Sequence, residues 1–378
     1  MGLRIAFAQT DAERETIYRL RYDVYVREMH MFGDVADHSG GRLFDEHDAT
    51  ARLIFAEVDG EIVGTVRLNW GGDAPFSDEH RRTYGLDPFL EVVDSSQLLV
   101  VTRMIVRATH RGSPLTVALL RASAEFGRVQ HAILAFCDCQ PHLISFYQVA
   151  GFRTYTAAYN DPHFGIMIPL VLVGPDIEYL ERVRSPLAEV LRSWSGDLSK
   201  FESLKTLIPD IPPVRAALRL DDRLATELQT LLGSHDDGRV GFFEDIDEAQ
   251  FRRLLERGHV IECARGDVVI RRGQIVRTVF VVLEGELEAQ RDGVRINVIR
   301  PSECFGEIAF LQGLPRTVDV VASAPRVLLL SLNEGVVRSL IAQDAGIAAK
   351  LLLNLARGLA LKLARRDADG ADTGAAAV

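Results

Sequence analysis

The chain contains few cysteines and no long hydrophobic segment. Its 378 residues include only Cys137, Cys139, Cys263 and Cys304, with no Cys-x-x-Cys pair. This excludes a disulfide scaffold, and we expect buried, reduced thiols and no metal site. No run of about 18 apolar residues occurs, and the apolar stretch at residues 3–7 is too short for a signal-peptide core. We therefore expect a cytoplasmic protein without a membrane span.

An excess of positive charge is also absent. The formal net charge is −10, from 43 Lys and Arg against 53 Asp and Glu, which argues against a nucleic-acid-binding protein. One stretch departs from this balance, because Arg103, Arg107, Arg111 and Arg121 are opposed only by Glu125. Such a stretch is typical either of a site for an anionic partner or of a solvated helix and loop face.

The length exceeds what one ordinary core needs, so the sequence predicts two domains and a connection. We expect an α/β domain over residues 1–173 and a helical linker over 174–240. An all-β roll with flanking helices should follow over 241–366, and a disordered tail over 367–378. Leu and Val recur at helical spacing in both halves of the linker, which favours packing on a domain.

Strands and helices alternate in the first domain. Thr10 and Glu13 form a capping box that opens a helix to about residue 29. Asp59-Gly60 predicts a hairpin between strands at 52–58 and 61–69. The remaining elements are expected in this order: a strand at 97–106, a helix at 115–129, a strand at 132–139, a helix at 141–150 and two strands within 152–173.

Residues 305–320 carry the most specific pattern. A short strand leads through Gly306-Glu307 into one apolar helical turn, and a Gly-Leu-Pro loop then precedes Arg316. This order predicts backbone N–H groups and one guanidinium directed into a single pocket, which suits a phosphodiester. Glu307 can accept a hydrogen bond from a sugar hydroxyl on the same ligand.

The stretch resembles the phosphate-binding cassette of cyclic-nucleotide-binding domains, as in the catabolite activator protein and protein kinase A families. The resemblance implies an allosteric ligand, which is cAMP by default or else cGMP. The sequence after the cassette shows no pattern that resembles a helix-turn-helix. Val318 stands where a smaller residue is usual and could narrow the pocket. The implied nucleotide-binding residues are Phe305, Gly306, Glu307, Ile308, Ala309, Arg316 and Thr317, with Arg316 on the exocyclic phosphate.

The order of elements in residues 3–173 is similar to that of the GNAT acyltransferase fold. Phe146-Tyr147-Gln148-Val149-Ala150-Gly151-Phe152 resembles the superfamily's element near the thioester. A narrower resemblance points to the acyl-homoserine-lactone synthase and long-chain N-acyl amino acid synthase branch. It is carried by Arg21, Asp45, Asp48, Gly64, Arg67, Thr102 and Arg103.

The resemblance implies how the reaction is divided among residues. The backbone of Arg103, Met104, Ile105 and Val106 would bind the acyl donor's pantetheine and the oxyanion. Tyr147 would give a proton to the departing thiolate, unless it is only a core aromatic. Asp45 and Asp48 would hold or deprotonate the amine, unless these two loop acids only face water.

The loop after the central strand departs from the family pattern. Arg111, Gly112 and Ser113 would bind the donor's pyrophosphate, but Pro114 and Thr116 occupy positions where small residues are usual. Proline has no N–H to donate, which favours an acyl-carrier-protein donor slightly over acyl-CoA. Val100 stands where lactone-forming relatives carry an acid, so we do not expect a homoserine lactone product.

We therefore predict a bacterial N-acyltransferase that is regulated by a cyclic nucleotide and acts on an amino-acid-like amine. One alternative is a cAMP-regulated protein lysine acetyltransferase that uses acetyl-CoA. A second is a non-catalytic sensor of acyl groups and cyclic nucleotides. The sequence gives neither the acyl length, the sign of regulation nor the oligomeric state.

Overall fold

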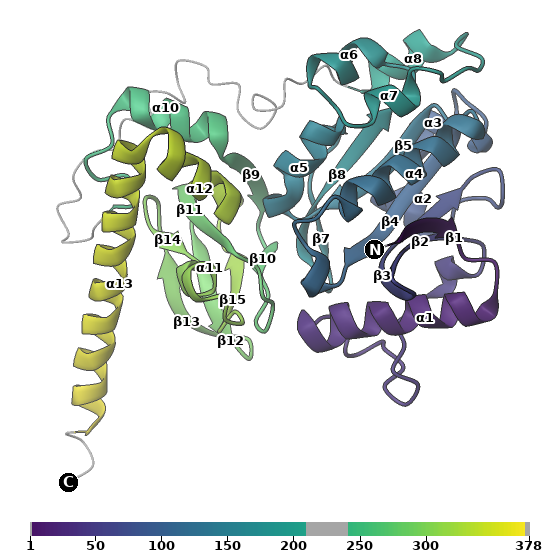
Figure 1. The fold of residues 1–378 in the computed structure, drawn as a ribbon. Helices are drawn as coiled ribbons and strands as arrows, with labels where there is room; N and C mark the ends of the chain where they lie inside the picture. The colour runs from purple at the N-terminus through teal and green to yellow at the C-terminus, as the bar shows by residue number, and fades with distance from the viewer. Residues whose placement is uncertain (1, 209–240, 375–378) are drawn as a thin grey trace. The chain divides into compact units, whose positions relative to one another are not determined.

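The computed structural model describes residues 2–208 and 241–374. They belong to two compact units, residues 1–213 and 214–378, which Figure 1 shows as ribbons. Among the described residues, no helix is both long and apolar enough to cross a bilayer. The predicted fold class is confirmed: an α/β acyltransferase-type unit is followed by a β-roll unit with flanking helices.

A single eight-stranded sheet organises the first unit, in the order β1-β2-β3-β4-β5-β8-β6, with β7 paired to β8. The first four strands are antiparallel, and β4 and β5 are parallel. Parallel neighbours need a crossover, which α4 (Leu115–Val129) provides. The strands are β1 (Leu3–Phe7), β2 (Arg52–Val58), β3 (Glu61–Trp70), β4 (Leu98–Val106), β5 (Leu134–Cys139), β6 (Arg153–Thr154), β7 (Tyr159–Asp161) and β8 (Gly165–Val173).

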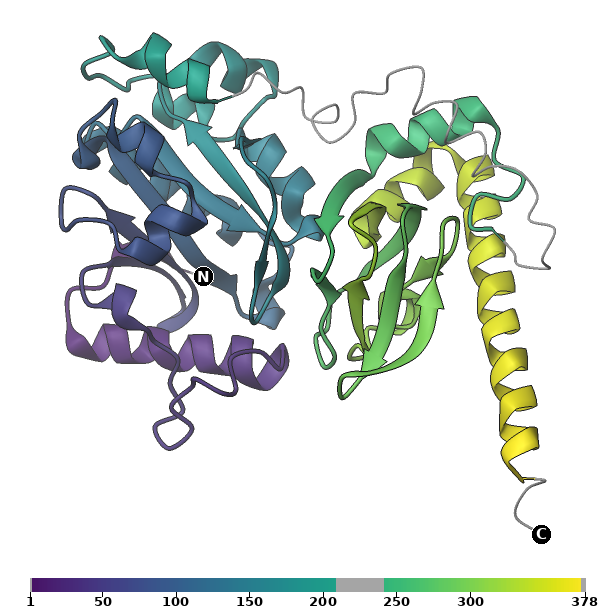
Figure 2. The same cartoon turned by 180° about the vertical axis from the view of Figure 1, so that it is seen from behind.

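Helices cover both faces of this sheet (Figures 1 and 2). Alternation along β2 sends Ile54 toward Leu119 of α4 and sends Phe55 toward Ile17 of α1 (Asp11–Arg21). The α4 face is also covered by α5 (Ile144–Ala150). The opposite face carries α1, the π-helix Tyr22–Glu28, α2 (Asp78–Thr83) and α3 (Asp87–Leu90).

The strands β4 and β5 separate partway along their length. They pair only from Leu98–Leu134 to Val100–Phe136, so the rest of β4 presents its edge without a partner in β5. At Arg103 the backbone of β4 has a φ of 53°, a left-handed conformation that is uncommon for a residue with a side chain. The unpaired edge is the splayed geometry that the GNAT resemblance implies.

Residues 174–208 belong to the first unit and do not form a separate linker. They form α6 (Ile177–Arg182), α7 (Ala188–Leu191) and α8 (Phe201–Leu207). Leu180 and Leu191 enter the core beneath α4, and Leu204 packs beside Phe136 on the other face. The expectation that this half of the predicted linker packs on a domain is thus met. Residues 209–240 lie outside the described residues.

The second unit is a roll of two four-stranded sheets, β10-β15-β12-β13 and β14-β11-β16-β9. Its core joins β11 and β16 to the helices through Val281, Leu330, Phe251 and Leu351. Its strands are β9 (His259–Ala264), β10 (Val268–Ile270), β11 (Thr278–Glu284), β12 (Leu287–Arg291), β13 (Val294–Ile299), β14 (Cys304–Phe305), β15 (Asp319–Ala322) and β16 (Arg326–Asn333).

In the part of the second unit that the structure describes, four helices accompany the roll, and the last one corrects a prediction. They are α10 (Glu248–Arg257), α11 (Glu307–Gln312), α12 (Glu334–Gln343) and α13 (Ala345–Gly374). We expected a disordered tail from residue 367, but α13 continues to Gly374. Residues 367–374 hold three Asp and two Gly, which have low helix propensity, so their own composition does not explain this continuation.

Candidate active site and nucleotide pocket

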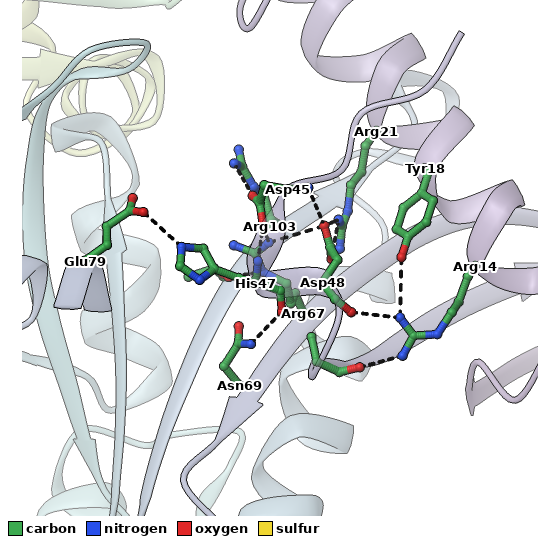
Figure 3. A network of polar contacts seen from close by, with 12 residues as sticks. Arg14, Tyr18, Arg21, Asp45, His47, Asp48, Arg67, Asn69, Glu79 and Arg103 are labelled. Atoms are coloured by element: carbon green, nitrogen blue, oxygen red, sulfur yellow. Dashed lines mark hydrogen bonds and ion pairs between the residues drawn. The ribbon is translucent and has the colours of Figure 1, made fainter. Parts of the chain in front are cut away.

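Five charged residues meet between α1 and the sheet of the first unit (Figure 3). We call them the Asp45 cluster: Arg21, Asp45, Asp48, Arg67 and Arg103. Arg21 comes from the end of α1, the two aspartates from the loop before β2, Arg67 from β3 and Arg103 from β4. The sequence resemblance named all five, and the fold brings them together.

Arg21 and Asp48 form the most buried pair of the cluster. Arg21 Nη1 lies 2.8 Å from Asp48 Oδ1 and 2.9 Å from Oδ2, and the two side chains are only 1% and 3% exposed. Arg21 Nε and Nη2 have no hydrogen-bond partner among the described residues. Asp48 therefore neutralises a guanidinium deep in the unit and does not face water.

Asp45 is bound by two guanidinium groups. It pairs with Arg67, and Arg103 Nη2 lies 2.9 Å from its Oδ2. Burial opposes its ionisation, but the charges of Arg67 and Arg103 outweigh it and hold the pKa of Asp45 below its ordinary value. A carboxylate so stabilised is a poor proton acceptor, so this geometry favours a positioning role for Asp45.

The loop that carries the two aspartates is fixed by further hydrogen bonds. The Asp45 carboxylate accepts from His47 N at 3.0 Å, and Asp48 Oδ2 accepts from Asp45 N at 3.0 Å. Asn69 Nδ2 donates to His47 O at 2.9 Å, and Arg14 Nη1 donates to Asp48 O at 3.0 Å. The cluster is therefore rigidly placed before any substrate binds.

Tyr147 lies on α5, beneath the opposite face of the sheet. Its ring is buried in the core cluster that includes Cys137 and Cys139 and packs edge-on against Phe152. Burial, together with the two thiols, raises the pKa of Tyr147 well above its ordinary value. The phenol stays protonated near neutral pH, as an ordinary tyrosine does, but the raised pKa makes it a weaker acid and does not by itself favour the donor role.

The loop before α4 retains part of a phosphate-binding geometry. Arg111 pairs with Glu28 and donates from Nε to Val106 O at 3.1 Å, and Ser113 Oγ donates to His110 O. Gly112 has a φ of 76°. The first turn of α4 leaves amide N–H groups without intrahelical acceptors, while Pro114 at its N-cap contributes none.

The arginines of the basic stretch are compensated by acids from elsewhere in the fold. Arg103 pairs with Asp45, Arg107 with Glu61, Arg111 with Glu28 and Arg121 with Glu189. The structure therefore favours the interpretation of a solvated, salt-bridged face and removes the charge argument for an acidic carrier protein.

In the second unit, Gly306 and Arg316 define a compact pocket wall. Gly306 has a φ of 80° between β14 and α11, and a Cβ there would lie 2.2 Å from Arg316 Nη1. Arg316 is buried and donates to Gly306 O and, at 2.8 Å, to Thr278 O. Burial, partly offset by Glu307, lowers the pKa of Arg316 to about 10, so it remains cationic.

Glu307 is bound by a lysine from the last helix. Lys362 Nζ of α13 lies 2.9 Å from Glu307 Oε1 and 2.9 Å from Cys304 O. Sequence reasoning did not identify Lys362, because it lies 55 residues from Glu307 and only the fold brings the two together. The carboxylate expected to hold a ribose hydroxyl is therefore already engaged.

The other predicted cassette residues surround this acid and arginine. Phe305 stacks on Phe280 with ring centroids 5.3 Å apart. Ala309 is buried, while Ile308 and Thr317 are exposed. The first intrahelical bond of α11 runs from Phe310 N to Gly306 O, so the N–H groups of residues 307–309 precede it.

One group of side chains in the described part of the chain could hold a metal ion. Ligand atoms of Glu46, His47 and Glu79 lie within 4.8 Å of one another. His47 Nε2 lies 3.0 Å from Glu79 Oε2, and its ring stacks on that of the buried His80. Exposed carboxylates gather in this way without an ion, so we assign no metal to the group.

Comparison with known proteins supports both resemblances. Residues 16–174 match the family model of the N-acyl amino acid synthase FeeM, and residues 260–344 match that of the cyclic nucleotide-binding domain. The first unit therefore carries a domain of the N-acyltransferase type, and the second a cyclic-nucleotide-binding domain.

Two curated relatives match part of this chain. The cAMP-dependent protein kinase regulatory subunit of Yarrowia lipolytica is 34% identical over 86 residues, which are 23% of this chain and 23% of that protein. The cGMP-dependent protein kinase isozyme 1 of Drosophila melanogaster is 31% identical over 91 residues, 24% and 12% of the two chains. This chain thus spans about a quarter or less of these two relatives.

Two solved structures are similar to parts of the chain. A CoA-dependent acyl-homoserine lactone synthase has a TM-score of 0.38 at 18% identity, covering 49% of this chain and 91% of that one. The catabolite activator protein of Thermus thermophilus has a TM-score of 0.32 at 20% identity, covering 35% and 62%.

Proposed function

We propose that the protein is a nucleotide-regulated N-acyltransferase. Its residues 16–174 match the N-acyl amino acid synthase family, and its residues 260–344 match the cyclic-nucleotide-binding family. It moves an acyl group from a thioester to the amine of an amino-acid-like acceptor. The observation that carries this proposal is the unpaired edge of β4 beside the Asp45 cluster, within a domain of that family.

The charge of the Asp45 cluster favours an acceptor with a carboxylate. Three guanidinium groups face two carboxylates, which leaves one positive charge. Arg103 is 17% exposed, against 4% for Arg67 and 1% for Arg21, so its guanidinium is the most accessible of the three. An amino acid fits because its carboxylate can bind there in bidentate geometry while its amine reaches the β4 edge.

The β4 edge supplies the electrostatic part of catalysis. Backbone N–H groups of residues 103–106 that have no partner in β5 can hold pantetheine and stabilise the oxyanion that forms on the thioester carbonyl. Tyr147, which is protonated at neutral pH as an ordinary tyrosine is, then donates its proton to the thiolate as the C–S bond breaks.

The donor is an acyl thioester. The loop before α4 is relevant to whether CoA or an acyl carrier protein carries the acyl group. Pro114 at the helix N-cap cannot donate to a pyrophosphate, which favours a carrier-protein donor over CoA. The compensated arginines add nothing to that preference. Comparing kcat/KM for palmitoyl-CoA and palmitoyl carrier protein tests it, and equal or better turnover with the CoA ester would reverse it.

Regulation follows from the nucleotide pocket of the second unit. A ribose hydroxyl and Lys362 compete for Glu307, so a bound nucleotide changes how α13 is held. The nucleotide can alter acyl transfer only if its affinity differs between the active and inactive arrangements of the protein. We propose that α13, which holds Glu307 through Lys362, is the element that differs between these two arrangements.

The proposed activity is tested with palmitoyl-CoA and, in parallel, with palmitoyl carrier protein, each with a mixture of the twenty L-amino acids. Released thiol is followed optically, and N-acyl products are identified by mass spectrometry. We expect amide products from the wild type and a large loss in Tyr147→Phe. Acylation of protein lysines alone would favour the lysine acetyltransferase alternative. Neither product nor thiol release from any amine would favour the non-catalytic sensor.

A further inference from the structure

Asp138 on β5 stands opposite the point where β4 and β5 separate. The last paired residues are Val100 and Phe136, so Thr102 and Asp138 occupy corresponding positions just beyond the last pair. Side chains alternate along a strand. Asp138 therefore shares the face of Leu134 and Phe136, whereas Cys137 and Cys139 share the opposite face with Tyr147.

The same alternation relates Asp138 to the Asp45 cluster. On β3, Val66 and Leu68 face α4, which places Arg67 on the opposite face. Arg67 Nε donates to Thr102 Oγ1 at 2.9 Å, and Thr102 is the residue that corresponds to Asp138 across the opening. Asp138 and the cluster thus lie on one side of the split, and Tyr147 lies on the other.

The partners of Asp138 are phenols. The Tyr159 hydroxyl of β7 donates to Asp138 Oδ2, and the Tyr84 side chain also hydrogen-bonds to the carboxylate. The nearby Arg103 pairs with Asp45 at 2.9 Å, and its charge only partly opposes the rise in the pKa of Asp138. Its titratable and charged neighbours are Tyr25, Tyr84, Tyr147, Tyr155, Tyr159, Cys137, Cys139, Asp161 and Arg103.

This setting differs from that of Asp45. Burial, with Asp161 adding to it, raises the pKa of Asp138, and the hydrogen bond from Tyr159 only partly opposes the change. Arg67 and Arg103 lower the pKa of Asp45 instead. Of these two carboxylates beside the split, Asp138 is the better proton acceptor.

We propose that Asp138, oriented by Tyr159, is the general base that takes the proton from the acceptor amine. The inference rests on the proposed acyl transfer. The amine nitrogen attacks the thioester carbon, and as the C–N bond forms its proton passes to the Asp138 carboxylate. As the C–S bond breaks, the thiolate takes a proton from Tyr147 on the other side of the split. The proton gained by Asp138 balances the one lost by Tyr147, and solvent exchange restores both groups.

The test is the pH profile of kcat/KM for palmitoyl-CoA and the amino acid that the wild type acylates best. Asp138→Asn should lower kcat/KM roughly 10²–10⁴-fold and abolish the decline toward acid pH. Tyr159→Phe keeps the base but removes a hydrogen bond to its charged form, so that decline should move to higher pH. Glu57→Gln is the control, because Glu57 is an ion-paired carboxylate on β2. Its pH profile of kcat/KM should equal that of the wild type.

A rescue experiment separates a base from a structural carboxylate. Asp138→Ala leaves space for a small acid, and added formate should restore part of its rate. Wild-type rates and an unchanged acid decline in Asp138→Asn would overturn the assignment while the proposed function stands. If the wild type itself gives neither amide nor free thiol, the proposed function fails, and the assignment fails with it.

Discussion

At the scale of single residues, the charge pairs of the Asp45 cluster contribute to the free energy of unfolding of the first unit. Asp48→Asn leaves the Arg21 guanidinium uncompensated in a site where both side chains are almost fully buried. We expect it to lower the free energy of unfolding by about 3–5 kcal/mol. Asp73→Asn breaks a surface pair with Arg52 and should cost less than about 1 kcal/mol. Urea titration of both variants checks the difference, and equal losses would contradict it.

The pH dependence of stability follows from Asp45. Its folded-state pKa is depressed, so its stabilising effect is fully present above its unfolded-state pKa of about 3.9 and is lost as the pH falls toward the folded value. The gap in unfolding free energy between the wild type and Asp45→Asn should be largest near pH 7 and should narrow below about pH 4. A gap that widens on acidification would exclude this account.

Sequence reasoning reached the members of the Asp45 cluster but not their environment. Asp45 and Asp48 were identified because they resemble a known branch, whereas the depressed pKa of Asp45 and the charge pairing of buried Asp48 depend on guanidinium groups from three other elements. Lys362 and Asp138 carry no local motif. Their partners lie 55 and 21 residues away, so only the fold shows them.

At the element scale, the turn between β14 and α11 requires glycine for two reasons. Gly306 combines a positive φ with a Cβ position that would lie 2.2 Å from Arg316 Nη1. Gly293 has a φ of 77° but nothing within 4 Å. Gly293→Ala should cost about 1–2 kcal/mol of stability and leave nucleotide affinity unchanged. Gly306→Ala should also displace Arg316 and weaken nucleotide binding, as calorimetry would show. Equal affinities in the two variants would contradict this role.

Helix α13 restrains the nucleotide pocket through Lys362. Burial disfavours its charge, but the nearby Glu307 outweighs this and raises the pKa of Lys362, so the pair stays charged. Lys362→Met should free Glu307 for the ribose and tighten nucleotide binding roughly tenfold, which equals about 1.4 kcal/mol. Lys350→Met is the control, because Lys350 lies on the same helix but binds Asp245 O and Gln250. Weaker binding in Lys362→Met would show that the lysine instead helps to hold the ligand.

Local signals predicted most elements well. The helix at 115–129 and the hairpin strands at 52–58 and 61–69 match α4, β2 and β3 almost residue for residue. Turn chemistry and alternation agree in the hairpin. The left-handed Arg103 could not be predicted in this way. Arg103 lies where the register of the β3–β4 pairing shifts, between the pairs Arg67–Thr102 and Thr65–Ile105, and such an irregularity depends on the partner strand.

At the scale of the whole molecule, sequence reasoning predicted two domains but placed the end of the first one too early. Residues 174–208 complete the first unit because α6, α7 and α8 bury Leu180, Leu191 and Leu204 against its sheet. Their amphipathic pattern indicated helices that pack, but not the surface on which they pack. Any regulatory signal from the nucleotide must therefore reach a catalytic unit that extends at least to residue 208.

The central claim is that a cyclic nucleotide bound to the second unit controls acyl transfer by the first. Its most direct test is the steady-state rate of amide formation by the full chain, with and without saturating cAMP or cGMP, in the wild type and in Arg316→Ala. We predict that at least one nucleotide changes the wild-type rate and that Arg316→Ala, which lacks the phosphate partner, does not respond. Identical wild-type rates under all three conditions would contradict the claim.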